Sequence, residues 1–516
     1  MSGAAADLEQ RAQQARAAAE AAGQGHVLEH WASLADSEKE TLLKDLEGLD
    51  YGYLSRVFSS SMAVSSAPTF DGIEPARDVL QLKDWEASDK AAEWTQHGYH
   101  LIAEGRAAVL LLAGGQGTRL GSSAPKGCYD IRLPSHKSLF QLQAERLLRM
   151  QQLAAAATNT AAADVKPLRW YVMTSAFTHD ETVAHFEQHG FFGLTREQVI
   201  FFQQGFLPCF TEDGKLILEA PGRLAKAPDG NGGVYLALAR SGLLDDMAAA
   251  GVEALDCYCV DNALARLGDP RFLGYCHGYC HGGGGEGGAG AGADVGARVV
   301  AKAYPEEKVG VFARRAAAAS AAAADGSGSG SAGTPAGALC VLEYSELDPG
   351  RAAATDPATG QLYFNWSNIC MHYFSVTWLR RVAAQLLAGG GTPYHVARKR
   401  IPSVAGPVAG VKLELFIFDT FPLAGERTAL VEVDRREEFA PVKNAPGSAS
   451  DSPDTARAAL LTLHAGWVRA AGGAVTCAEG VEVSPLLSYG GEGLGPVVGG
   501  KSYEQPWADE LQRPAA

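Results

Sequence analysis

Four glycines and two basic residues follow an apolar run near residue 110, and together they could bind phosphate. The run Val109–Ala113 leads directly into Gly114–Gly121, whose sequence is GGQGTRLG, and Lys126 follows. Glycine has no side chain, so backbone N–H groups in such a loop can approach phosphate oxygens closely. Arg119 and Lys126 place positive charge beside them. The pattern predicts a phosphate-binding loop after a strand.

The loop differs from two common nucleotide-binding motifs. A P-loop has the pattern G-x-x-x-x-G-K-[ST], which this segment lacks. The glycines at 115, 117 and 121 also miss the G-x-G-x-x-G spacing of dinucleotide-binding enzymes. Neither of these protein classes is therefore expected.

Length and composition indicate a large, ordinary globular protein. A chain of 516 residues is too long for one core and predicts two or three domains. The formal net charge of −15 disfavours a nucleic-acid partner, which would require a broadly basic surface. An anionic substrate must then be attracted by a local group of cations.

The sequence favours a cytoplasmic protein. No apolar segment approaches the ~18–20 residues that span a bilayer, so no membrane partner is expected. The first residues lack the apolar core of a signal peptide. Nine cysteines, an odd number, are typical of reduced thiols. The segment Cys276–His281 resembles half of a zinc knuckle, but no second ligand pair follows at zinc-finger spacing, so zinc is not expected.

Short apolar runs alternate with helical segments from about residue 107. Such alternation predicts an α/β domain with a mostly parallel, Rossmann-like sheet, in which ligands bind at the carboxyl ends of strands. Helix start signals lie between the runs, with Ser138 and Gln141 forming one candidate capping box and Thr178 and Glu181 another. The predicted strands are 108–113, 170–174, 199–203, 255–260, 298–302 and 339–344.

The remaining segments predict three regions. Residues 1–106 form a mostly helical N-terminal extension, with helices over 1–22 and 38–49. Residues 107–405 form the α/β domain, interrupted by Gly/Ala-rich insertions near 282–297 and 316–338 that cannot bury enough apolar surface to become ordered. Residues 406–516 form a small α+β C-terminal domain with strands at 412–418 and 429–433 and a helix at 455–471.

Further segments resemble one enzyme family when they are taken in order with the glycine loop. The loop and Pro125-Lys126-Gly127 are similar to the signature of sugar-nucleotide pyrophosphorylases. The whole set, which covers roughly residues 30–480, resembles the eukaryotic UDP-N-acetylhexosamine pyrophosphorylases and is most similar to their plant or algal branch. The additional segments are FQQG (202–205), APDGNGG (227–233), CVDN (259–262), LEYSE (342–346), FAPVKNA (439–445), VGV (309–311), WSN (366–368) and KLELFIFD (412–419).

The resemblance implies a uridylyltransferase. Such an enzyme condenses UTP with N-acetylglucosamine 1-phosphate to UDP-N-acetylglucosamine and releases pyrophosphate. Cations must then neutralise the leaving group. Arg119 can offer its planar fork to the β- and γ-phosphates, and Lys126 can bridge the α-phosphate and the sugar phosphate. Lys443 is expected to reach the phosphates from the C-terminal domain. Asp261, at the end of a strand, is the implied ligand of Mg²⁺ or Mn²⁺.

The resemblance also implies two sets of substrate contacts. Uracil has alternating acceptors and a donor, which the nucleotide-binding residues would match. The sugar contacts are polar groups suited to hydroxyl and acetamido hydrogen bonds, and Phe416 and Phe418 are candidates for the pocket wall. The nucleotide-binding residues are Gly114, Gly115, Gln204 and Gly230, and the sugar-binding residues are Asn231, Gly310, Glu343 and Asn368.

Two other functions fit parts of the pattern. A broad-specificity UDP-sugar pyrophosphorylase acting on glucose or galactose 1-phosphate would share the phosphate chemistry and differ only in the sugar pocket. A non-catalytic UDP-sugar-binding regulator would keep the fold, although such a protein has no need of the cations and the aspartate together. The sequence leaves open the relative use of N-acetylglucosamine, N-acetylgalactosamine and glucose phosphates, the oligomeric state and the regulation.

Overall fold

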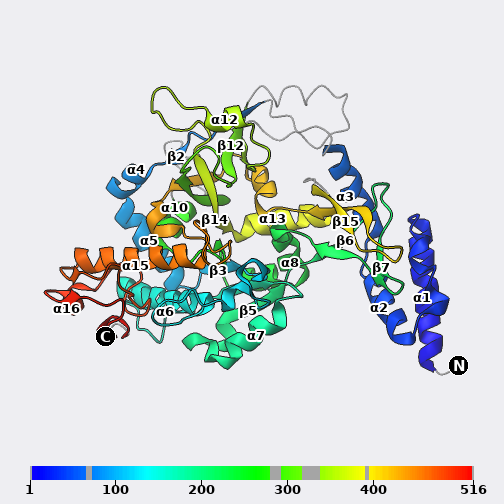
Figure 1. The fold of residues 1–516 in the computed structure, drawn as a ribbon, viewed down its shortest axis with the longest axis horizontal. Coiled ribbons are helices and arrows are strands. Elements are labelled where there is room, and N and C mark those ends of the chain that lie inside the picture. The colour runs from blue at the N-terminus through cyan, green and yellow to red at the C-terminus, as the bar shows by residue number, and fades with distance from the viewer. Residues whose placement is uncertain (1–2, 65–71, 279–291, 317–336, 390–393, 514–516) are drawn as a thin grey trace.

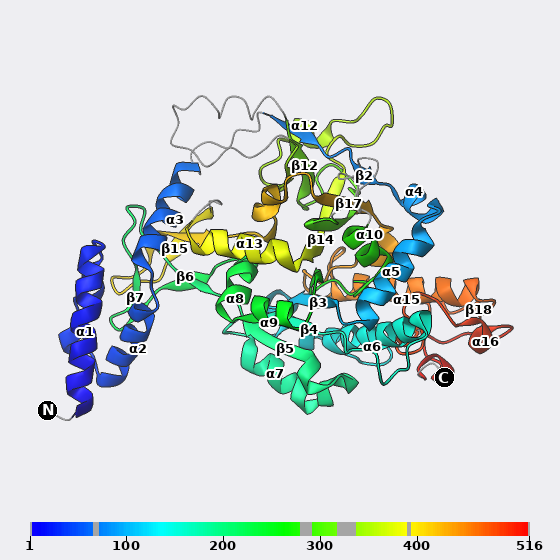
Figure 2. The same ribbon diagram turned by 180° about the vertical axis from the view of Figure 1, so that it is seen from behind.

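The computed structural model describes residues 3–64, 72–278, 292–316, 337–389 and 394–513. A central sheet forms the body, helical N-terminal segments lie at one end, and the C-terminal helices lie toward the other (Figures 1 and 2). No helix among these residues is long and apolar enough to cross a membrane. The predicted insertions fall largely on 279–291 and 317–336, outside the described residues, and residues 295–297 begin a strand.

One mixed sheet runs through the body, and along its main path five of the seven neighbouring pairs are parallel. Along its main path the strand order is β2-β17-β11-β14-β10-β3-β4-β5, and only β14 is antiparallel to its neighbours there. The strands in that order are β2 (Val79–Leu80), β17 (Thr428–Glu432), β11 (Val295–Ala301), β14 (Trp366–Ser375), β10 (Ala254–Cys259), β3 (Ala107–Leu112), β4 (Trp170–Thr174) and β5 (Val199–Gln203). The predicted α/β class is thus confirmed.

Buried apolar strands explain why the sheet forms where the sequence predicts it. Every residue of β3 and of β4 is buried, as expected for strands covered on both faces. One face is covered by α5 (Ala91–Ala103), α6 (Leu139–Thr158) and α10 (Pro270–Gly278). Helices α5 and α10 approach closely at Gly98 and Gly274, where a Cβ atom would lie 1.8 Å from a backbone oxygen of the other helix.

Helix starts follow the predicted signals in one case and not in the other. Ser138 caps α6 by accepting a hydrogen bond from Gln141 N at 3.2 Å. Thr178 precedes α7 (His179–Gln188), but its hydroxyl accepts a hydrogen bond from Ser175 N at 3.0 Å and does not cap the helix. The predicted capping box of Thr178 and Glu181 is therefore wrong, because the Thr178 hydroxyl bonds within the turn that follows β4.

The N-terminal helices contact the body through a set of short hairpins. Helices α1 (Gly3–Ala21), α2 (Asp36–Glu47) and α3 (Tyr51–Val64) lie together, and Arg11 of α1 bonds Glu47 of α2 at 2.7 Å. Lys226 pairs with Asp45 at 2.5 Å and so joins α2 to a hairpin. The hairpins are β6 (Phe206–Pro208) with β9 (Lys226–Pro228), β7 (Leu218–Ala220) with β8 (Arg223–Leu224), and β15 (His395–Ile401) with β16 (Val408–Glu414).

The C-terminal segment differs from expectation in two places. The predicted strand 412–418 is split, because β16 ends at Glu414 and a 3-10 helix, η8 (Ile417–Ala424), follows. Asp419 starts that helix by accepting a hydrogen bond from Phe416 N at 2.7 Å. Strand β17 lies in the central sheet beside β11, although it was expected in the C-terminal domain. The three-domain division remains a prediction, and the long helix α15 (Pro453–Ala470) lies where the sequence predicts it.

A second, smaller group of strands extends the central sheet from the start of β14. Strand β12 (Val311–Arg315) pairs with β1 (Ile73–Pro75), with β13 (Leu339–Leu342) and with the start of β14. These pairs are antiparallel. They bring segments around residues 310 and 343 to the edge where β14 begins.

Candidate active site

The predicted site residues converge at one edge of the central sheet. Strands β3, β4, β5 and β10 are parallel, so their carboxyl ends share that edge. Strand β14 runs the opposite way and therefore begins there. The glycine loop follows β3, Gln204 follows β5, Asp261 follows β10, and Asn368 lies at the start of β14. Strand order thus assembles residues that are far apart in the chain.

The glycine loop folds back on itself and carries Lys126 to its own start. Gly117 N donates a hydrogen bond to Ala124 O at 3.1 Å, and Lys126 N donates to Gly115 O at 3.3 Å. Gly121 has a φ of +75°, a left-handed conformation that favours glycine. The closed loop leaves Gly115 and Arg119 exposed to solvent.

A lysine and an aspartate meet below this loop. Lys126 Nζ lies 3.4 Å from Asp261 Oδ2, and the two side chains are 17% and 18% exposed. Asp261 is held through its backbone, because Val442 N donates to Asp261 O at 2.9 Å. Lys443 is the next residue, so the backbone of the C-terminal segment carries a second lysine to this corner of the site. The loop, both lysines and the aspartate are therefore neighbours.

A second group surrounds the start of the loop. Gln204 Nε2 donates a hydrogen bond to Gly230 O at 2.9 Å, and Ser175 Oγ donates to Gly114 O at 2.9 Å. A Cβ atom on Gly114 would lie 2.7 Å from Gln204 Oε1, so a side chain there would displace the Gln204 amide. Gly230 has a φ of +88°, and a Cβ atom there would lie 2.2 Å from Leu415 O. The predicted nucleotide residues thus form one close-packed group.

Three of the four predicted sugar residues, Gly310, Glu343 and Asn368, lie side by side. Asn368 N donates to Gly310 O at 2.8 Å, and Glu343 lies beside Gly310, where a Cβ atom would be 3.0 Å from its Oε1. Burial, and then the neighbouring carboxylate of Glu346, raise the pKa of Glu343. Asn231 Oδ1 accepts a hydrogen bond from Ile417 N at 2.9 Å.

The two candidate phenylalanines differ in their surroundings. The ring of half-buried Phe416 packs on His395 with a centroid distance of 4.3 Å. Phe418 is only 7% exposed and lies in the core. His395 bonds Asp419 at 2.9 Å. Although burial opposes it, this contact raises the pKa of His395. Neither residue was assigned a role from the sequence: His395 lies outside the quoted segments, and Asp419 entered only as the last residue of KLELFIFD.

A buried carboxylate lies behind the nucleotide group and was also missed. Asp229 is 2% exposed, and its Oδ1 has no hydrogen-bond partner among the described residues. Its side chain occupies the space beside Gly205 and Gly233, where Cβ atoms would lie 2.5 Å and 2.0 Å from its oxygens. Burial raises the pKa of Asp229 to about 6, and the adjacent Gln204 amide partly counteracts this. The two glycines, at 205 and 233, were the available signal.

A buried ion-pair network supports the site from behind. Arg298, 1% exposed, bonds Asp256 of β10 at 2.9 Å and Glu438 at 2.8 Å. Asn262, next to Asp261, donates to Glu438 O at 2.7 Å and accepts from Ala440 N at 3.0 Å. The segment that carries Lys443 is therefore anchored to the strand that carries Asp261.

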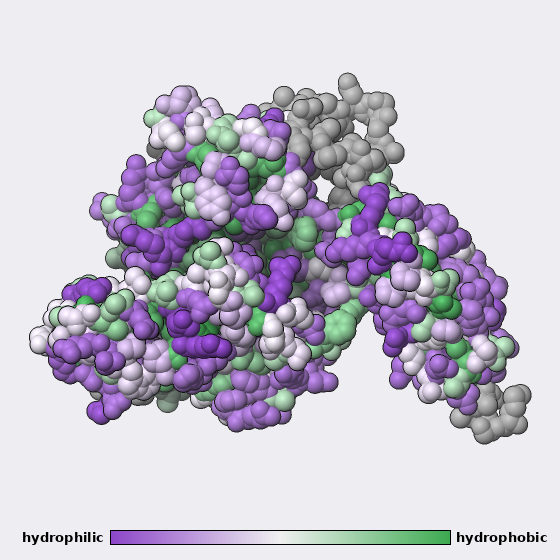
Figure 3. Space-filling view, viewed as in Figure 1, coloured by the Kyte–Doolittle hydropathy of each residue, from purple (hydrophilic) through white to green (hydrophobic). Residues whose placement is uncertain are grey.

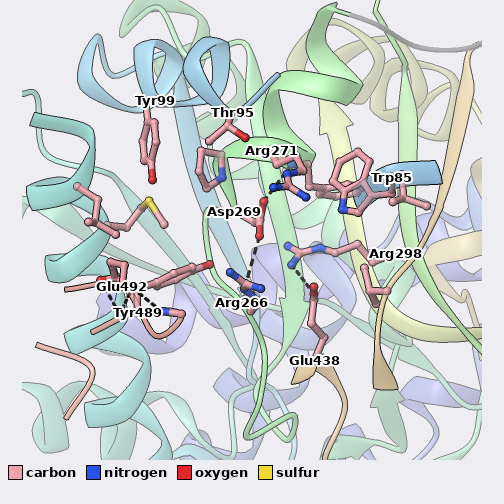
Figure 4. A pocket seen from close by; sticks show the side chains of 17 residues that line it. Trp85, Thr95, Tyr99, Arg266, Asp269, Arg271, Arg298, Glu438, Tyr489 and Glu492 are labelled. Atoms are coloured by element: carbon pink, nitrogen blue, oxygen red, sulfur yellow. Dashed lines mark hydrogen bonds and ion pairs between the residues drawn. The ribbon is translucent and has the colours of Figure 1, made fainter. Parts of the chain in front are cut away.

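A cavity of about 270 Å³ adjoins this network, and it is distinct from the predicted site. Figure 4 shows Arg298 pointing toward Glu438, and Arg266 lying between Asp269 and the Tyr489 ring. None of the predicted site residues lines it. On the molecular surface, a hollow with apolar residues at its base opens near the centre of the face in Figure 3.

The described residues contain no cluster of three or more His, Cys, Asp or Glu side chains arranged to hold a metal. Cys276 and His277 belong to α10, whereas Cys280 and His281 lie outside the described residues. Asp261 at the strand end is the one carboxylate that the sequence analysis assigned to a metal. A single carboxylate suits Mg²⁺, which is commonly held by one or two carboxylates together with substrate phosphates.

Comparisons with known proteins identify relatives of this chain. Residues 72–321 match the family described as UTP–glucose-1-phosphate uridylyltransferase. The UDP-N-acetylglucosamine diphosphorylase 2 of Arabidopsis thaliana is 47% identical, and the match covers 94% of this chain and 91% of that protein. The UDP-N-acetylglucosamine pyrophosphorylase of Saccharomyces cerevisiae is 38% identical over 92% of this chain and 94% of its own length.

Solved structures show the same architecture. The uridine diphosphate N-acetylglucosamine pyrophosphorylase of Trypanosoma brucei, solved with an inhibitor, has a TM-score of 0.78 and is 32% identical, with 96% of this chain and 95% of that chain covered. The UDP-glucose pyrophosphorylase of Leishmania major has a TM-score of 0.54 at 19% identity, with 79% and 77% covered. The latter likeness concerns the fold alone.

Breaking the Arg298 network should destabilise the protein strongly. In Arg298→Met two buried carboxylates lose their cation, which typically costs about 3–5 kcal/mol. As a matched control, Arg380→Met removes an exposed pair with Asp245 and should cost less than about 1 kcal/mol. Urea unfolding of both variants measures the difference. Equal midpoints would contradict the structural role of Arg298.

The buried carboxylate of Asp229 should make stability depend on pH. A folded-state pKa of about 6, above the ordinary 3.8, means that its contribution to stability is full below pH 3.8 and lost as the pH rises through 6. Asp229→Asn lacks this titration, so its stability relative to the wild type should rise on the order of 3 kcal/mol between pH 4 and 7.5. Denaturant unfolding across that range measures the trend, and parallel profiles would contradict it.

Proposed function

This chain belongs to the UDP-N-acetylglucosamine pyrophosphorylase family, and we propose that it condenses UTP with N-acetylglucosamine 1-phosphate to form UDP-N-acetylglucosamine and pyrophosphate. The resemblance found in the sequence motifs, including its plant-like character, is thereby confirmed. The observation that carries the proposal is the meeting of Lys126 with Asp261 at 3.4 Å beside the glycine loop. A site for UTP with its metal ion needs the lysine and aspartate charges in one place.

The proposed chemistry relies on positioning and on charge neutralisation. An oxygen of the sugar phosphate attacks the α-phosphorus of UTP, and pyrophosphate leaves on the opposite side. Arg119 is exposed on the loop and can follow the β- and γ-phosphates, whereas Lys126 is held near Gly115 and is suited to the α-phosphate and the sugar phosphate. Lys443 adds charge from the C-terminal segment. The attacking phosphate is already an anion, so no general base is required.

Asp261 would hold the divalent metal, Mg²⁺ or Mn²⁺. Its carboxylate is partly exposed at a strand end, so it can bind a divalent cation. The Lys126 ammonium group beside it can bind the phosphate oxygens that accompany the metal. A bound metal would stabilise the charge that develops on the transferring phosphoryl group. The chain's own part is to fix the Asp261 backbone through the hydrogen bond from Val442 N.

Uracil selection is assigned to Gln204 and to the glycines at 114, 115 and 230. Gln204 uses its Nε2 on Gly230 O, which leaves Oε1 toward Gly114. An amide oxygen in that position can accept the N3–H of uracil, a donor that cytosine lacks. Gly114 and Gly230 also have no room for a side chain. Replacing the substrate donor by an acceptor would leave buried groups unpaired and cost affinity.

The sugar pocket is assigned to Asn231, Gly310, Glu343 and Asn368. Asn368 and Gly310 are joined by a backbone hydrogen bond, and Glu343 lies against Gly310, so the group can present several polar atoms to one sugar. Half-buried Phe416 can supply an apolar wall for an acetamido methyl group, whereas Phe418 belongs to the core. A cytoplasmic location and the absence of a nucleic-acid partner complete the proposal, and the net charge of −15 supports the second of these.

Release of pyrophosphate from defined sugar phosphates tests the function directly. With UTP and Mg²⁺ we expect release with N-acetylglucosamine 1-phosphate and a clearly lower kcat/KM with glucose or galactose 1-phosphate. Equal rates for all three sugars would instead indicate the broad-specificity enzyme. Release with none of them, while UDP-N-acetylglucosamine still binds, would indicate the non-catalytic regulator.

Removing the Lys126 ammonium should slow turnover. Lys126→Ala loses one charge contact to the transition state, which predicts a fall in kcat of ~10²-fold or more. Lys83→Ala is the control, because Lys83 is exposed on α4 (Leu82–Ala87) away from the loop. Steady-state kinetics of both purified variants measures the effect. A Lys126→Ala enzyme that keeps most of its rate would remove this residue from the mechanism.

A further inference from the structure

Two half-buried cysteines touch each other at the edge of the sheet where the site lies. Cys259 is the last residue of β10, and Cys370 belongs to β14, next to Met371, which pairs with Tyr258. Their Sγ atoms are 3.0 Å apart, with the Cys259 thiol donating to Cys370. The two residues are 111 positions apart in the sequence, so antiparallel pairing alone brings them together.

The backbone at Cys370 is unusual for a strand residue. Its φ is +55°, and the register between β14 and β11 shifts at this point. Such bulges change the direction of a side chain. Asn368 Oδ1 accepts a hydrogen bond from Cys370 N at 2.9 Å and holds the irregular turn in place. The contact between the thiols is therefore part of a defined local structure.

We propose that Cys259 and Cys370 are a redox modification site that forms a reversible disulfide with a small disulfide, such as oxidised glutathione, as oxidant. The Cys370 thiolate attacks the small disulfide, which gives a mixed disulfide and releases one small thiolate. Cys259 Sγ then attacks Cys370 Sγ and releases the second. Both protein thiols are oxidised, one small disulfide is reduced to two thiols, and the two protein S–H protons end on those thiols or in solvent.

The geometry requires little movement for this bond. A disulfide has an S–S length of about 2.05 Å, so the sulfurs must approach by roughly one ångström from their present separation of 3.0 Å. Both residues keep part of their surface exposed at this edge, which is the side from which a small oxidant would approach. The eight described cysteines form no disulfide in the present structure. Among them, this pair is the one whose thiols are in hydrogen-bond contact.

The bond would act on the site through its two strands. Asp261 follows Cys259 by two residues, and Asn368 precedes Cys370 by two residues. A covalent link would shift the carboxylate assigned to the metal relative to the amide assigned to the sugar, which lowers the transfer rate because small misplacements are costly. This consequence rests on the proposed function, whereas formation of the bond does not.

Oxidation of the purified full chain tests the site. We expect oxidised glutathione to produce a crosslinked peptide containing Cys259 and Cys370, lighter by two hydrogens in mass spectrometry, together with a fall in pyrophosphate release on the order of tenfold. Dithiothreitol should restore both. Cys370→Ser should keep its activity under oxidant, and Cys340→Ser, a half-buried cysteine of β13, should respond like the wild type.

Two results would overturn the proposal. A stable glutathione adduct on either cysteine without the crosslink would show that the pair does not close. A complete crosslink with an unchanged rate would show that the bond has no effect on the site. If the reduced protein releases no pyrophosphate with any sugar phosphate, the proposed function fails, while the peptide map still decides whether the bond forms.

Discussion

The buried guanidinium of Arg298 joins strand β10, which leads to Asp261, to the segment that leads to Lys443. It connects Asp256, inside β10, to Glu438, on the segment that leads to Lys443. Asn262, which follows β10, makes a second connection to the same segment through hydrogen bonds with the backbone of Glu438 and Ala440. Because charges so deeply buried are stable only when paired, the segment cannot move away from β10 without leaving a charge unpaired. The Asp261 corner of the site depends on this constraint.

An acidic protein that binds polyanions must concentrate its positive charge locally. The chain carries a net charge of −15, yet Lys126 lies beside the Asp261 carboxylate, Arg119 belongs to the same glycine loop, and Lys443 follows the residue that bonds the Asp261 backbone. The glycine loop achieves part of this by its own backbone hydrogen bonds, and the sheet supplies the rest by placing strand ends side by side. Local placement of basic residues thus allows polyanion binding although the overall charge of the protein is negative.

Parts of the site are held at a cost to stability. Asp229 keeps a carboxylate behind the nucleotide group, where burial disfavours its charge. It lies against Gly205 and Gly233, and Gln204, which bonds Gly230, is adjacent to it. A site that keeps an amide in one orientation needs such rigid surroundings, and an unpaired buried group at the edge of a binding region is consistent with selection for that orientation.

Local pattern was sufficient to locate most elements of the central sheet and to select candidate residues that meet at one edge of it. The bounds of β4 and β5 agree with the prediction because both are short, largely apolar runs, and Ser138 signals α6 through its own cap. The motifs also located Lys126 and Asp261. Tertiary structure alone decided the position of β17 in the central sheet, the burial of Asp229 and the contact between Cys259 and Cys370. These depend on which strands become neighbours, and strand order is set by packing across hundreds of residues, which no local pattern records.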